Sequence, residues 1–156
     1  MPRAAKEIIE FEEDQLGPLL DALGRLSKAE GWINLTPGVP AEVELAEDRS
    51  LLSFLVGSRR LEAPMATWMP EAGGPSGTGT LGILHARGRL HREGLAGLAA
   101  IPSGWRCTQD HARRGLLFAV RGASDLEIAE SMVGVVEELA TVTTTGRYLA
   151  ELFLRS

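Results

Sequence analysis

Residues 125–140 constrain the fold more than any other segment, because they combine a helix-capping sequence with a broad apolar face. Ser124 and Asp125 stand where a helix N-cap is expected. The apolar residues that follow recur at helical spacing: Leu126, Ile128, Ala129, Met132, Val133, Val136 and Leu139. A face of this width packs well against a sheet. The segment therefore predicts a helix over 125–140 that covers a β-sheet.

Two further helices and several strands are expected. Leucines at helical spacing predict a helix over 13–29, whose regular part begins near Gly17 because Pro18 fits best in a first turn. A shorter helix is expected around 89–100. Apolar alternation or short apolar runs predict strands at 32–35, 43–45, 51–56, 61–69, 80–85, 105–109, 116–120 and 147–154. The chain is therefore expected to be α+β, a mainly antiparallel sheet with about three helices on one face.

The strand at 116–120 is expected inside the sheet, beneath the helix at 125–140. Strand periodicity places Leu116, Phe118 and Val120 on one face. Trp32 and Trp105 each follow an expected helix and begin an expected strand, a common position for a ring that closes a helix–sheet core. The two helix–strand–strand units around these tryptophans resemble each other, which suggests a pseudo-repeat.

Length and composition indicate one domain over 1–156 without disulfides. The 156 residues suffice for a single core, and residues 70–79, rich in glycine and proline, are interpreted as a flexible loop within it. The single cysteine excludes an intrachain disulfide. A net charge of −5 gives no overall attraction to nucleic acid or to an anionic membrane, so neither is expected as a partner. The acidic N-terminal segment lacks the apolar stretch of a signal peptide, and a cytoplasmic location is expected.

Ionisable and nucleophilic groups are concentrated in residues 104–118. Cys107 and His111 could form a thiolate and its base, with Asp110 orienting the imidazole. Because all three come from one short segment, the favoured interpretation is a cysteine pointing from a strand into the core and a histidine in a turn. No catalytic residue is assigned on this basis.

No metal or cofactor is expected from the remaining motifs. Cys107 with His85, His91 and His111 would satisfy tetrahedral zinc chemically, but the short paired spacings of zinc motifs are missing. Residues 74–81 resemble a phosphate-binding loop only superficially, since Thr80 and Leu81 stand where lysine and a hydroxyl residue are required.

Arginines make the middle of the chain locally basic. Arg106, Arg113 and Arg114 could bind a carboxylate or phosphate, because the guanidinium fork suits both groups. Pairing with acids of the same protein or of another subunit is the favoured alternative. The hypothesis of an anionic ligand uses the 70–79 loop as a lid over these three arginines.

The stretch from Trp105 to Leu117 contains a tryptophan followed by Gln-Asp-His-x-Arg-Arg-Gly-Leu, and it resembles a segment that recurs in proteins of high-GC Gram-positive bacteria. That resemblance implies no activity and no site residue. The order of expected elements is also similar to secretion-chaperone-like α+β domains, which implies a partner-binding sheet. The leading hypothesis is a non-enzymatic interaction or assembly domain, a chaperone-like or adaptor protein that forms a homodimer or holds a protein partner. The alternative is a small-molecule-binding protein or enzyme that recognises an anionic ligand.

Overall fold

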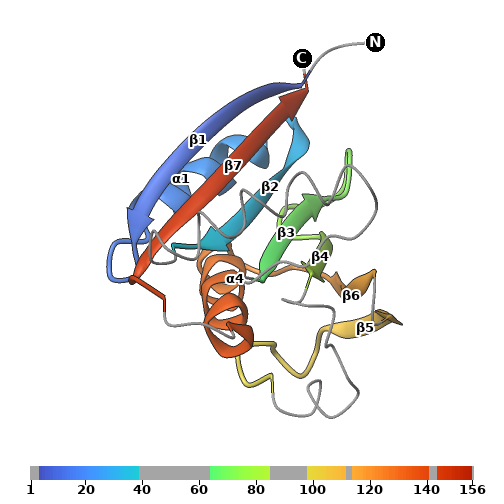
Figure 1. Cartoon of the computed structure of the whole chain (residues 1–156). Helices are drawn as coiled ribbons and strands as arrows, with labels where there is room; N and C mark the ends of the chain where they lie inside the picture. Colours follow the sequence, from blue (N-terminus) through green and yellow to red (C-terminus); the bar gives the residue numbers. More distant parts are fainter. Residues whose placement is uncertain (1–3, 39–63, 85–97, 112–113, 141–143, 156) are drawn as a thin grey trace, which may run out of the picture.

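The chain forms a seven-stranded antiparallel sheet with two helices in the part described by a computed structural model, residues 4–38, 64–84, 98–111, 114–140 and 144–155 (Figure 1). The strand order is β1-β7-β2-β3-β4-β6-β5. The elements are β1 (Ala5–Glu12), α1 (Gly17–Leu26), β2 (Glu30–Pro37), β3 (Met65–Pro70), β4 (Gly79–Leu84), β5 (Arg106–His111), β6 (Gly115–Val120), α4 (Asp125–Leu139) and β7 (Arg147–Arg155).

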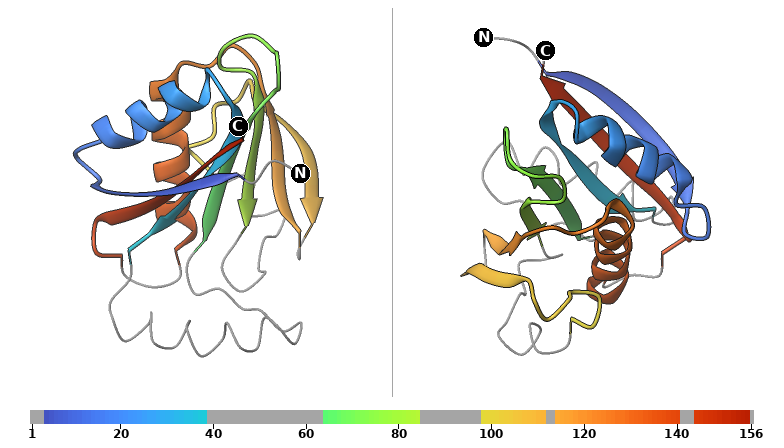
Figure 2. Two further views of the ribbon diagram at one scale, coloured as in Figure 1. Left: turned by 90° about the horizontal axis from the view of Figure 1, so that it is seen from above. Right: turned by 180° about the vertical axis from the view of Figure 1, so that it is seen from behind.

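Both described helices lie on the same face of the sheet, which confirms the α+β class (Figure 2). The helix α1 packs on β1, β2 and β7, and α4 packs on β2, β3 and α1. The described part holds two helices rather than about three. Most of the helix expected around 89–100 falls outside it, as do the strands expected at 43–45 and 51–56, so the suggested repeat cannot be traced in the structure.

The helix α4 has the sequence-predicted position along the chain but not the predicted position on the sheet. Its N-terminus is closed by a capping box, in which Glu127 N–H donates to Ser124 Oγ (3.1 Å) and Ser124 N–H donates to Glu127 Oε2 (2.9 Å). The sequence predicts α4 over β6, but the strands on which α4 chiefly packs are β2 and β3. Because β7 is inserted between β1 and β2, the chain must cross β4 and β3 after leaving β6, and α4 therefore lies over β2 and β3.

The core lies between the helices and the sheet face that they cover. In β6 the residues Leu116, Phe118 and Val120 are buried, while Leu117 and Ala119 on the other face are half-buried, as the strand periodicity predicts. Between β4 and β5, β6 is an interior strand, which is also confirmed. Trp105 packs against the core as expected.

The strand β1 was not predicted. Its sequence, AKEIIEFE, is mostly exposed, with only Phe11 buried and Ile9 half-buried. Its position is determined by pairing with β7 over all eight residues and by the stacking of Phe11 on Tyr148, with ring centroids 5.3 Å apart. A strand with so little buried surface has a weak sequence signal.

The segment interpreted as a flexible loop is the turn of the β3–β4 hairpin. Glu71 N–H donates to the Thr78 carbonyl (2.9 Å), and Ala123 N–H donates to the Gly77 carbonyl (3.1 Å). The second bond ties the turn to the segment before α4. A strand, β4, follows the turn, as the sequence predicts.

A partly buried polar cluster links α4 to β7. The hydroxyl of Tyr148 donates to Glu137 Oε1, and Thr144 Oγ1 donates to the same carboxylate (3.1 Å to Oε1). The pKa of Tyr148 is raised well above its usual value, chiefly by burial and secondly by the hydrogen bond to Glu137. The folded chain therefore holds the phenol in its neutral form.

We expect this cluster to produce an alkaline limit to stability. The pKa of Tyr148 is raised in the folded chain, so its contribution is complete below the unfolded value of about 10 and is lost as the pH rises above it. Tyr148 is the only tyrosine, so ultraviolet absorbance of tyrosinate reports it alone. Tyrosinate should appear only as circular dichroism shows unfolding, and Tyr148→Phe should lack this alkaline step. A tyrosinate signal from folded chain near pH 10 would contradict the assignment.

Candidate functional site: the edges of the sheet and a cleft between two strands

The sequence-predicted site residues lie on the β5–β6 hairpin, where the structure separates them. Cys107 pairs with Phe118 of β6, and His111 pairs with Gly115 of β6. Because these two partners are three residues apart on β6, the side chains of Cys107 and His111 point to opposite faces of the sheet. Cys107 Sγ donates to the Gln109 carbonyl (3.2 Å), and His111 Nδ1 accepts from Arg114 N–H (3.1 Å). The strand does not bring thiol and imidazole together.

The prediction that Cys107 points into the core is wrong, because Cys107 is exposed. It lies on β5, the last strand of the sheet, while the described helices pack on β1, β2, β3 and β7. Asp110, which lies on β5 as well, pairs with Leu116 of β6 and is also exposed. Within the described ranges, no three histidine, cysteine or acidic residues are grouped as metal ligands would be.

The arginines proposed to bind an anion are also apart. Arg106 pairs with Ala119 and Arg114 immediately precedes Gly115, so they lie at opposite ends of the hairpin. Arg113, His85 and His91 lie outside the described residues. The ion pairs in the described part use other cations, Lys6, Arg25 and Arg147, and neither Arg106 nor Arg114 takes part in them.

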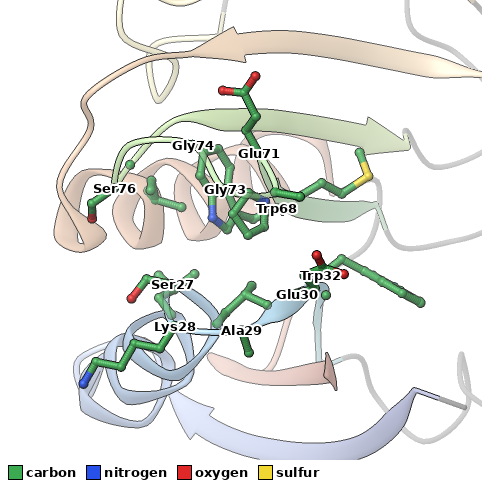
Figure 3. Close-up of a pocket in the computed structure, with 18 of the residues that line it drawn as sticks. Ser27, Lys28, Ala29, Glu30, Trp32, Trp68, Glu71, Gly73, Gly74 and Ser76 are labelled. Atoms are coloured by element: carbon green, nitrogen blue, oxygen red, sulfur yellow. The ribbon is translucent and has the colours of Figure 1, made fainter. Parts of the chain in front are cut away.

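A cleft of about 500 Å³ opens where β2 and β3 separate (Figure 3). The β2–β3 ladder ends at the pair Ile33–Trp68, and two residues further on Pro70 has no N–H to offer Gly31. One wall is the turn after α1, which includes Ser27 and Ala29, and the other is the β3–β4 turn. The glycine-rich turn thus borders this cleft, whose lining includes neither Arg106 nor Arg114.

Among the described strands, β1 pairs with β7 alone, and its other edge faces no described strand; this edge is called the free edge of β1 below. Glu13 N–H donates to the Gly146 carbonyl (3.0 Å), one step beyond the pair Glu12–Arg147. Because hydrogen-bonded and non-hydrogen-bonded pairs alternate in an antiparallel ladder, the odd-numbered residues of β1 bond to β7. The N–H and C=O groups of Lys6, Ile8 and Glu10 therefore point away from β7, toward the free edge.

Side chains of these same residues lie on the outer face, the sheet face opposite α1 and α4. Ile8 is 58% exposed, the highest value among the large apolar side chains of the described residues. Beside it, Lys6 forms an ion pair with Glu151 (2.5 Å) and its Nζ lies 5.9 Å from the Phe153 ring centre. The edge thus presents backbone groups, an apolar side chain and flanking charges together.

The aromatic side chains of the outer face correct the prediction for Trp32. Trp32 stacks on Phe153 of β7, with ring centroids 4.7 Å apart and planes 12° apart, and the Arg155 guanidinium lies 5.4 Å from its centre. The ring therefore does not close the helix–sheet core. Ile33, the next residue of β2, is buried on the face that the helices cover, so Trp32 and its partner Phe153 lie on the outer face.

Comparisons with known proteins leave this geometry as the basis for function. No protein-family model, curated protein or solved structure significantly matches the chain. Neither of the described helices has the length and apolar character needed to cross a membrane.

Proposed function

We propose that the chain is a non-enzymatic protein-interaction or assembly domain that associates through the free edge of β1. The observation that carries the proposal is a regular eight-residue edge strand whose outward backbone groups flank the exposed Ile8. An edge of this kind is a template for pairing with another strand. The same proposal includes that the protein is bacterial and cytoplasmic and that it acts as a homo-oligomer or an adaptor.

The contrast between the two edges of the sheet supports this choice. The other edge strand, β5, has six residues, and its register shifts between Cys107 and Gln109, which marks a bulge. Bulges and short edge strands are devices that prevent edge-to-edge pairing. The β1–β7 register is continuous over all eight pairs. Only one of the two edges therefore has the regular geometry that a partner strand needs.

The alternative function is the binding of a small molecule. The cleft between β2 and β3 supports this alternative, whereas Arg106 and Arg114 do not. Its volume of about 500 Å³ lies within the range of about 300–1,000 Å³ found for ligand pockets. Leu26, Trp68 and Ile128 supply apolar lining. Arg106 and Arg114 lie at opposite ends of the β5–β6 hairpin, which argues against an anion site formed by these arginines under the 70–79 loop.

Ile8→Pro is the sharpest test of the proposed function. The substitution removes an N–H that points outward, so the ladder to β7 is retained while the edge is blocked. Proteins from a cell extract that bind the wild-type chain, identified by mass spectrometry, should be lost with Ile8→Pro and retained with the β5-edge variant Thr108→Pro. If both variants retain the same proteins, the β1 edge is not the binding surface.

A further inference from the structure

We propose that two copies of this chain pair through β1, antiparallel and about a two-fold axis at Ile8, to form one continuous sheet. The inference rests on the proposed function and names the partner of the same edge. It follows from three properties of β1, which are the alternation of its backbone groups, the order of its charges and the position of its exposed apolar residue.

The backbone alternation restricts the register. Only even-numbered residues of β1 direct N–H and C=O groups outward, so an even-numbered residue must face an even-numbered residue of the second copy. Pairing with the axis at Ile8 satisfies this rule. Ile8 then exchanges two hydrogen bonds with its counterpart, and Lys6 and Glu10 exchange two with each other at both ends.

The side chains choose among the registers that the backbone allows. With the axis at Ile8, Lys6 faces Glu10 of the second copy twice, and the two exposed Ile8 side chains face each other on the outer face. With the axis at Ile9, Ile8 faces Glu10 and stays beside a charge. With the axis at Glu10, two carboxylates face each other, which is repulsive.

The opposite face of β1 also accepts this register. There Glu7 faces Ile9 of the second copy, and Ala5 faces Phe11. Glu7 already forms an ion pair with Arg25 of α1 (2.7 Å), which lowers the pKa of that carboxyl, chiefly through the hydrogen bond from Arg25. The half-buried Ile9 would extend the core of one copy toward the other.

A charge-swap series measured by light scattering tests the pairing. The wild type should have twice the monomer mass of 16.7 kDa. Lys6→Glu and Glu10→Lys should each place like charges opposite one another and weaken the dimer at least about tenfold, the effect of two such contacts. The double variant should restore it. Circular dichroism checks each fold, since Lys6 also pairs with Glu151. Equal dimerisation of all four proteins would overturn the inference.

Cysteine cross-linking in a Cys107→Ser background tests the register itself. In an antiparallel hydrogen-bonded pair the Cα atoms are about 5.5 Å apart and the two side chains lie on the same face, so a short bis-maleimide reagent can join two cysteines there. Ile8→Cys should therefore form a covalent dimer with this reagent. Lys6→Cys is the control, because in this register residue 6 faces Glu10 of the second copy. The two introduced cysteines would then be four residues apart along the strand and could not be joined. A dimer from Lys6→Cys with none from Ile8→Cys would overturn the register.

The result for the wild-type chain separates this inference from the proposed function. A monomer by light scattering that still binds an Ile8→Pro-sensitive protein partner would overturn self-pairing and leave the interaction edge standing. A monomer with no such partner would overturn both. A dimer that forms the Ile8→Cys cross-link and is lost in Ile8→Pro supports both.

Discussion

Phe118→Ala should destabilise the fold by about 3–5 kcal/mol, a large share of the roughly 5–15 kcal/mol that stabilises a typical domain. The ring is 5% exposed and belongs to the core between sheet and helices. It lies on an interior strand, facing Leu81 of β4 and Cys107 of β5. Because neighbouring backbones are fixed by both ladders, the space left by the ring would remain a cavity.

Chemical denaturation of the wild type and two variants measures this effect. Leu117→Ala is the matched control, since Leu117 is the next residue of the same strand but is half-buried on the outer face. We expect its loss to be below about 2 kcal/mol, because part of the side chain already contacts water. Equal losses for the two variants would contradict the assignment of the faces.

The elements that were predicted correctly are those with strong local patterns. The helices α1 and α4 have apolar faces with helical spacing and recognisable ends, and β6 is a short run of consecutive apolar residues. The position of α4 over β2 and β3 was not predictable in the same way. It depends on the insertion of β7 between β1 and β2, a pairing between the two ends of the chain that no local pattern contains.

The candidate site was not predictable from side-chain chemistry. Cys107, Asp110 and His111 lie close together in the sequence, but the strand β5 directs Cys107 and His111 to opposite faces of the sheet. The β1 edge owes its character to backbone N–H and C=O groups, which every residue except proline carries. Its only sequence signal is weak: Ile9 and Phe11 alternate with Glu10 and Glu12.

The second large effect is expected for Gly77→Ala, in the turn between β3 and β4. Gly77 has a left-handed backbone (φ +74°), which costs an L-residue about 1–2 kcal/mol. A Cβ at this position would also overlap the carbonyl oxygen of Ala123, in the segment that leads into α4. The Gly77 carbonyl accepts the hydrogen bond from Ala123 N–H, so the turn cannot move away without losing that bond. We expect a total loss of about 2–5 kcal/mol.

Gly73→Ala separates the steric contribution from the backbone strain. Gly73 belongs to the same turn and has nearly the same backbone conformation (φ +70°), but a Cβ there would meet no atom within 4 Å. Its loss should stay near the 1–2 kcal/mol of left-handed strain alone. The difference between the two variants in chemical denaturation measures how tightly the turn is held against the start of α4. If Gly73→Ala is as destabilising as Gly77→Ala, the close approach of Gly77 to Ala123 does not exist in the folded chain.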